Sequence, residues 1–289
     1  MSVAYKQKGV LLTVLASLMF GSSPVFMRLI LDFVNVETMN VLFTAFTVLC
    51  FVVLFGASKM AHFRSILGNW RKVTLLGLIS AAGALMYTYG IFLCGPVNAA
   101  FLMQFTTVFT ILFGVAFFKE RFTRLEAAGV LVAIVGVFVL AYGDLVLEIE
   151  STLVLLGAAL FLASANSLSK AYVKDLNPVA LAGGNTMFML LFIFAYAVLS
   201  GRLETAFPSV TLAYALLGSV IGGVLSFILF FKALQIFEVS KVATIRTIEP
   251  FLTAVFSLAI LALTPTANQL LGGALIVVGV LGVSLTKGK

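Results

Sequence analysis

Histidine and cysteine are scarce in this sequence, and so are charges. Only 10% of its 289 residues are charged, and it contains one histidine, two cysteines and one tryptophan. His62 stands in a polar segment beside Arg64, with no second histidine to complete a metal site. Cys50 and Cys94 fall in or at the end of apolar stretches, which argues against a disulfide framework. We therefore predict no metal site and no structural disulfide.

The sequence also lacks the motifs of nucleotide-dependent chemistry. It contains no P-loop, no dinucleotide-binding glycine fingerprint and no HExxH motif. The chain is therefore not predicted to be an enzyme, to hold a cofactor, or to drive transport with ATP by itself. Its net charge of +7 comes from short basic clusters between apolar stretches, so nucleic acid is not an expected partner.

Apolar residues are what the sequence has in excess. They make up 62% of the chain, and the mean hydropathy is +1.19, whereas roughly half is usual in a soluble domain. They form runs of about 20 residues, which as helices cross a hydrocarbon core of roughly 30 Å. Because a helix satisfies its own backbone in lipid, we predict an all-α integral membrane protein. Its ten transmembrane helices are expected at about 9–31, 36–57, 72–93, 97–118, 125–142, 152–173, 178–200, 210–234, 241–263 and 268–286.

The first of these spans is too long for the apolar region of a signal peptide, about 7–15 residues, so we expect it to stay in the membrane. The loops alternate in charge: one set is basic, and the other is acidic with Arg202 as its single basic residue. Since cytoplasmic loops are rich in Lys and Arg, both termini are predicted to be cytoplasmic, in a multi-pass protein of the plasma or inner membrane.

An internal repeat divides the chain. Shifted by 143 positions, residues 98–137 lie over residues 241–280 without a gap, and Gly129 and Gly136 fall on Gly272 and Gly279. We predict two five-helix halves, 1–143 and 144–289, of opposite orientation because each has an odd number of spans. Such a 5+5 inverted repeat is typical of transporters. The glycine-bearing fifth and tenth spans are expected to be scaffold helices or the contact face of a homodimer.

Several motifs resemble those of EamA-type transporters. The segment Phe113–Gly129 is similar to the signature that ends their fourth helix, and Phe20-Gly21-Ser22 is similar to their first-helix motif. Lys232–Gln235 and Ser240–Ala254 resemble their second repeat, and the resemblance covers the whole chain. It implies a ten-helix secondary carrier of the drug/metabolite transporter superfamily, working by alternating access on solutes such as amino acids and other metabolites.

The sequence departs from the family pattern where the two halves differ in chemistry. Glu120 corresponds to Leu263, so the second half lacks the usual acidic residue. Thr106-Thr107 in the first half corresponds to Glu249-Pro250 in the second. The family resemblance therefore does not set the substrate.

Glu249 is the clearest candidate for a functional residue. It lies about eight residues, or about 12 Å, into its predicted span, and a carboxylate at that depth normally faces a partner or a water-filled cavity. Arg246, three residues earlier, shares its helix face. Together they could bind a zwitterion, or Glu249 could carry a coupling proton, because burial favours the neutral form of a carboxyl group. An internal Arg246–Glu249 pair is the alternative.

Proline marks two expected helix breaks. Pro250 removes a helix hydrogen bond beside Glu249, and Pro24 does so in the first span. The residue opposite Pro24 in the second half is near Asn166. Interrupted helices at equivalent places in two halves indicate a transporter site.

Other polar residues inside the spans are weaker candidates. Tyr87, Gln104, Asn98 and Asn166 could contact the solute, although polar side chains in lipid often only join helices. Lys232 could snorkel at its helix end or face the same cavity as Arg246.

The sequence thus predicts a secondary transporter in the lipid bilayer that exports small organic solutes, amino acids or related metabolites. Two alternatives remain open. A proton-coupled exporter of lipophilic cations would use Glu249, but the charge of Arg246 argues against it. A carrier of phosphorylated or nucleotide-linked anions would need Arg246, Lys232 and Lys241 to converge.

Overall fold

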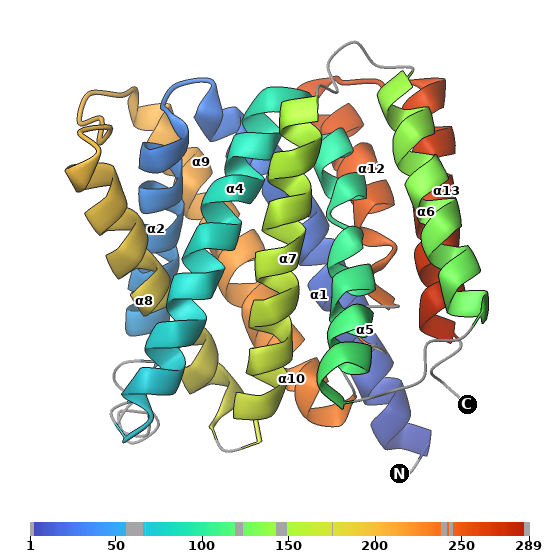
Figure 1. Ribbon diagram of the computed structural model, residues 1–289. Helices are drawn as coiled ribbons and strands as arrows, with labels where there is room; N and C mark the ends of the chain where they lie inside the picture. The colour runs from blue at the N-terminus through green and yellow to red at the C-terminus, as the bar shows by residue number, and fades with distance from the viewer. Residues whose placement is uncertain are drawn as a thin grey trace.

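A computed structural model describes residues 3–55, 66, 68–118, 124–142, 149–174, 176–237, 242 and 245–285 of the protein. These residues form a bundle of roughly aligned helices, with no strand among them (Figure 1). The all-helical prediction is therefore confirmed for the described part of the chain. His62, the link between the predicted halves and part of the basic loop residues lie outside the described residues; these basic residues are Lys59, Arg64, Lys119, Arg121, Lys241, Lys287 and Lys289.

The helices follow one another along the chain with short connections. The first half contains α1 (Val3–Leu31), α2 (Val36–Phe55), α4 (Trp70–Leu102), α5 (Phe105–Phe118) and α6 (Arg124–Tyr142). The second contains α7 (Ile149–Tyr172), α8 (Pro178–Leu199), α9 (Ser209–Gly218), the π-helix η1 (Ser219–Leu225), α10 (Ser226–Ile236), α12 (Glu249–Leu261) and α13 (Ala267–Leu285).

Six helical segments among the described residues are long and apolar enough to cross a membrane. They are α1, α2, α4, α7, α8 and the continuous segment of α9, η1 and α10, and three shorter apolar helices accompany them in α6, α12 and α13. The chain is thus a multi-pass membrane protein, and the count of ten crossings stays a prediction. The start of α1 and the end of α13 lie at the same end of the bundle (Figure 1).

The boundary expected between the third and fourth spans, at residues 94–96, coincides with a break inside α4. The expected fourth span is interrupted a second time, by a turn at Met103 and Gln104 before α5 begins at Phe105. Within α4, Gly95 has φ 79° and ψ 167°, a conformation that favours glycine, and Pro96 follows it. The chain breaks the helical path at this Gly-Pro pair and resumes it, because the proline has no N–H to continue the hydrogen-bond ladder.

The helix contacts are reciprocal between the halves. Helix α1 packs against α10 and α12, whereas α7, the first helix of the second half, packs against α4 and α5. The remaining helices pair across the halves, α2 with α8 and α6 with α13. Residues far apart in the sequence therefore enclose the centre of the bundle together.

Helices α6 and α13 lie side by side at one edge of the bundle (Figure 1). A β-carbon on Gly279 would lie 2.5 Å from the Ala133 nitrogen and 2.5 Å from the Gly129 oxygen. A β-carbon on Gly136 would lie 2.7 Å from the Gly272 oxygen. The matched glycines thus serve contact between these two helices of one chain, as small residues do in lipid.

The helix ends are fixed by polar contacts. At one end, Arg202 Nη1 lies 2.8 Å from Glu37 Oε1, and the Asn35 side-chain amide donates to the Arg202 carbonyl oxygen at 2.6 Å. The hydrogen bond to Glu37 raises the pKa of Arg202. At the other end, Lys170 Nζ donates to the carbonyl oxygens of Leu234 and Phe237, each at 2.6 Å. These carbonyls end α10, so Lys170 caps that helix.

Candidate functional site

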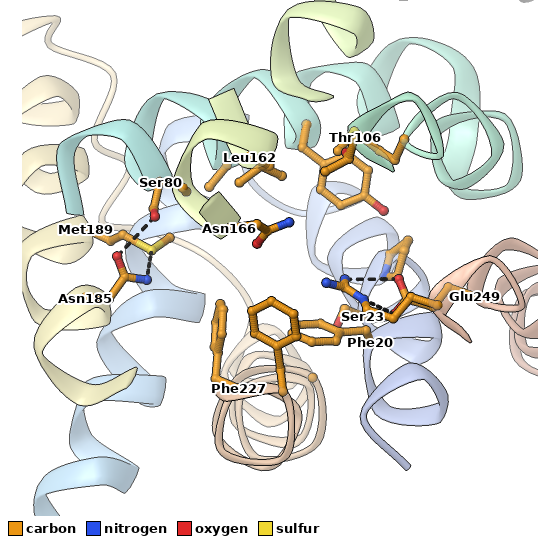
Figure 2. A pocket seen from close by; sticks show the side chains of 18 of the residues that line it. Phe20, Ser23, Ser80, Thr106, Leu162, Asn166, Asn185, Met189, Phe227 and Glu249 are labelled. Atoms are coloured by element: carbon orange, nitrogen blue, oxygen red, sulfur yellow. Dashed lines mark hydrogen bonds and ion pairs between the residues drawn. The ribbon is translucent and has the colours of Figure 1, made fainter. Parts of the chain in front are cut away.

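A cavity of about 220 Å³ lies at the centre of the bundle. Residues of α1, α2, α4, α5, α7, α8, η1, α10 and α12 line it, so both halves contribute to its wall. Polar side chains gather at opposite sides, with aromatic rings between them (Figure 2).

An ion pair forms one side of the cavity. Arg246 Nε donates to Glu249 Oε1 at 2.6 Å, and Nη2 donates to Oε2 at 3.2 Å. The guanidinium carbon also lies 4.6 Å from the ring centroid of Phe20 and 4.8 Å from that of Phe230. Such a bidentate pair with cation–π contacts holds the guanidinium in one orientation. The side chains remain 21% and 17% exposed, and they supply the only ionic groups among the described residues that line the cavity.

A break in the chain places this pair. Thr247 and Ile248 form a turn, and α12 begins at Glu249 with Pro250 in its first turn. A carboxylate is favoured at a helix N-terminus, where the backbone N–H groups leave a partial positive charge. Pro250 costs no hydrogen bond there, because the first N–H groups of a helix have no partner within it.

An equivalent break lies in the first half. Met103 and Gln104 form a turn between α4 and α5, and the repeat shift of 143 carries them onto Arg246 and Thr247. Each half therefore interrupts its path at the cavity and begins a new helix there. The first half presents the hydroxyl of Thr106 where the second presents Glu249.

The helix break expected at Pro24 is wrong, because α1 continues through it. A break does lie beside Pro250, at the turn of Thr247 and Ile248, and the proline opens the helix that follows. The neighbouring helix compensates in α1: Thr253 Oγ1 donates to the Gly21 carbonyl oxygen at 2.9 Å, in the turn that Pro24 disturbs. Helix α7 likewise runs unbroken past Asn166.

Uncharged polar groups form the opposite side of the cavity (Figure 2). Ser80 Oγ donates to Asn185 Oδ1 at 3.0 Å, and Asn185 Nδ2 donates to the sulfur of Met189 at 3.6 Å. Asn166 projects into the space between this group and Glu249 (Figure 2). Ser80 and Asn185 are only 5% and 3% exposed.

Most of the residues singled out from the sequence line this cavity. Arg246, Glu249, Tyr87, Gln104 and Asn166 do so.

Asn98 and Lys232 lie away from the cavity. Asn98 is buried, and its side-chain amide donates to the Cys94 carbonyl oxygen of its own helix at 3.1 Å. This contact bridges the turn that contains the Gly95 break. Lys232 is exposed on α10, the residue after buried Phe231, so its helix position turns it outward. Depth in a span could be estimated from sequence, but the facing direction of these side chains could not.

Sequence reasoning missed several lining residues. Phe20 and Phe230 hold the guanidinium, and Ser80 donates to Asn185 in the second polar group. Among 28 phenylalanines, none carries a sequence signal that separates a cavity ring from a lipid-facing one. The Gly95-Pro96 pair did carry a signal, because a Gly-Pro dipeptide marks a turn.

The π-helix η1 also had no clear signal in the sequence. Its Ser219 hydroxyl donates to the Phe43 carbonyl oxygen at 2.7 Å, and Gly222 lines the cavity. A β-carbon on Gly222 would meet the Ser23 hydroxyl, so α1 and η1 touch with no room for a side chain. Such π-turns are frequent at functional sites.

Comparisons with known proteins agree with this architecture. The model of the EamA-like transporter family matches residues 7–142 and again residues 151–285. A solved structure, described only as the crystal structure of a protein, has a TM-score of 0.71 and 14% identity to the chain. That likeness covers 97% of this chain and 99% of the other, and at this identity it shows the fold alone. None of the curated proteins matches the chain at a significant level.

Proposed function

The chain belongs to the EamA-like transporter family, and from this premise we propose that it exports small zwitterionic solutes, amino acids or related metabolites, by alternating access. Membership of this family makes it a membrane transporter of solutes. The solute class, the direction and the coupling belong to the proposal.

The proposed frame is ten transmembrane helices arranged as a 5+5 inverted repeat, with halves 1–143 and 144–289 and both termini cytoplasmic. Three observations support it. The family model matches the chain twice in succession, the helix contacts are reciprocal between the halves, and α1 begins on the side of the bundle where α13 ends. In such a frame the helices of the two halves rock about a site between them.

The proposed solute class rests on the ion pair in the central cavity, whose two charges neutralise each other. Arg246 and Glu249 compensate each other when no solute is present. A zwitterion can insert between them, its carboxylate taking Arg246 and its ammonium taking Glu249, and no charge is left unpaired. A monovalent anion or cation would leave one of the two groups without its partner, which is costly away from water.

The size of the cavity restricts the solute further. At about 220 Å³ it is smaller than the ~300–1,000 Å³ typical of sites for drug-sized ligands. A small amino acid fits this space better than a nucleotide-linked sugar. The anion-carrier alternative loses support as well, because Lys232 is exposed and does not line the cavity.

Proton coupling would act through Glu249 in this proposal. The deprotonated carboxylate pairs with the solute ammonium, and protonation of Glu249 on the opposite side removes that counter-charge and promotes release of the solute. Phe20 and Phe230 keep the guanidinium in place during the exchange, since their contacts do not depend on the charge of Glu249.

Flux in proteoliposomes tests the proposal. Labelled neutral amino acids should accumulate against their gradient when a pH difference is imposed, and Glu249→Gln should reduce this accumulation at least about tenfold. Glu150→Gln is the matched control, because Glu150 is an exposed carboxylate at the start of α7 that does not line the cavity.

Two results would count against it. Unchanged flux in Glu249→Gln would remove the ion pair from the mechanism. Efflux of lipophilic cationic dyes that amino acids do not inhibit would favour the cation-exporter alternative.

A further inference from the structure

The cavity has a second recognition element besides the ion pair. We use the name amide pole for Ser80, Asn166 and Asn185, which line the cavity. Ser80 and Asn185 lie on the side away from Glu249, and Asn166 projects between them and Glu249 (Figure 2). The three residues come from three helices, α4, α7 and α8. Phe227 and Phe20 lie between Asn185 and Glu249 (Figure 2).

The amide pole has hydrogen-bonding capacity that the protein does not use. The side-chain amide of Asn166 has no hydrogen-bond partner among the described residues, although it can donate two bonds and accept two. The side-chain oxygen of Asn185 accepts a hydrogen bond from Ser80, but its N–H group donates to the thioether sulfur of Met189 at 3.6 Å, which is a weak acceptor. Asn185 is buried and Asn166 is half-buried where it meets the cavity. Because buried polar groups are nearly always satisfied, water or a solute is the partner left for these amides.

The amide pole carries no charge. Arg246 and Glu249 are the only ionic residues among the described residues that line the cavity. Glu249, to which Arg246 is paired, lies across the cavity from Asn185 (Figure 2). A charged group placed against Asn166 and Asn185 would lose its water shell without gaining a counter-charge. An apolar group would leave the amides without partners. A neutral group that both donates and accepts satisfies them.

We propose that Ser80, Asn166 and Asn185 form a specificity subsite that selects zwitterions whose far end carries a neutral amide or hydroxyl group. This inference rests on the proposed function, because the zwitterionic head occupies the ion pair. The tail then spans the aromatic wall between the two polar sides. Selection arises because only such a solute satisfies both the ion pair, with its charged head, and the amide pole, with its neutral tail.

The test compares three solutes of similar length on the purified full-length protein. Dissociation constants are measured by calorimetry for L-glutamine, L-norleucine and L-glutamate, which end in an amide, a methyl group and a carboxylate. The wild type should bind glutamine at least about tenfold more tightly than either of the others, since an unpaired buried polar group disfavours the apolar analogue by about this factor.

The variant Asn166→Leu removes the amide and keeps its approximate volume. It should reduce the preference for glutamine over norleucine to about twofold or less, while norleucine still binds. Its folding is not at risk from a lost hydrogen bond, because the Asn166 side chain makes none to the described residues. Asn185→Leu should act in the same direction. Ser167→Ala is the control: its hydroxyl donates to the Ala163 carbonyl oxygen of its own helix at 2.9 Å, and it does not line the cavity.

The outcomes separate the two proposals. If glutamine and norleucine bind the wild type equally, or if Asn166→Leu keeps the full preference, the subsite is wrong and the ion-pair proposal stands. If none of the three solutes binds, the proposed function fails and the subsite fails with it.

Discussion

Removing the charge of Arg246 should destabilise the protein more than removing both charges of its ion pair. Breaking a fully buried pair costs about 3–5 kcal/mol because one charge is left without a partner. The side chains here keep 21% and 17% exposure toward the cavity, so water can solvate part of the remaining charge. We therefore expect Arg246→Met to cost about 1–3 kcal/mol.

The partner substitution should cost less. In Glu249→Gln the guanidinium keeps its contacts with the rings of Phe20 and Phe230, and a glutamine oxygen can still accept a hydrogen bond from it. We expect a loss below about 1 kcal/mol. The double variant Arg246→Met/Glu249→Gln contains neither charge, so it should be more stable than Arg246→Met alone.

Thermal unfolding of the purified variants in one detergent measures these differences. A loss of 1–3 kcal/mol corresponds to a decrease of roughly 2–6 °C in the melting temperature. Arg28→Met is the control, because Arg28 and Asp32 are 34% and 49% exposed in their pair and such exposed pairs contribute about 0–1 kcal/mol. A double variant less stable than Arg246→Met, or an Arg246→Met variant as stable as the wild type, would refute the reasoning.

Two further predictions concern stability alone. Gly279→Ala should lower the melting temperature by an amount equivalent to about 1–3 kcal/mol, because its β-carbon would meet backbone atoms of α6 at 2.5 Å. Gly282→Ala is the control and should be tolerated, because its β-carbon would lie 3.7 Å from its nearest neighbour. Equal effects of the two substitutions would contradict the packing argument. Lys170→Met should lower the stability by about 1–3 kcal/mol in the same assay, because two hydrogen bonds to the end of α10 are lost. Lys174→Met, at an exposed position two residues beyond α7, should melt like the wild type. If the two lysine variants melt at the same temperature, the capping role of Lys170 is contradicted.

The sequence was most informative at positions where exposing a charged side chain to lipid would cost much free energy. A carboxylate and a guanidinium in an apolar stretch cannot face acyl chains without a compensating partner, so Glu249 and Arg246 stood out, and both line the cavity. The sequence also allowed their pairing as an alternative to solute binding, and the structure shows that pair closed. Asn98 stood out for the same reason, but it serves its own helix.

Helix breaks were harder to place. Proline alone did not locate them, because α1 continues through Pro24 with a neighbouring helix compensating its carbonyl groups. The breaks lie at Gly95, at the turn before α5 and at the turn before α12. Two of the three begin new helices at the cavity, so they depend on contacts that a single span does not contain.

The sequence by itself determined that the chain is helical, lies in the membrane and repeats a unit, because hydrophobic length, sparse charge and a fixed period are properties of the chain. The tertiary structure alone decided which side chains share the cavity. Phe20, Ser80, Asn166 and Asn185 lie on α1, α4, α7 and α8, and a helix in an apolar bundle can turn a polar or aromatic face toward any of several neighbours. Only the packing of all the helices together fixes that rotation, and with it the distance between the ion pair and the amide pole.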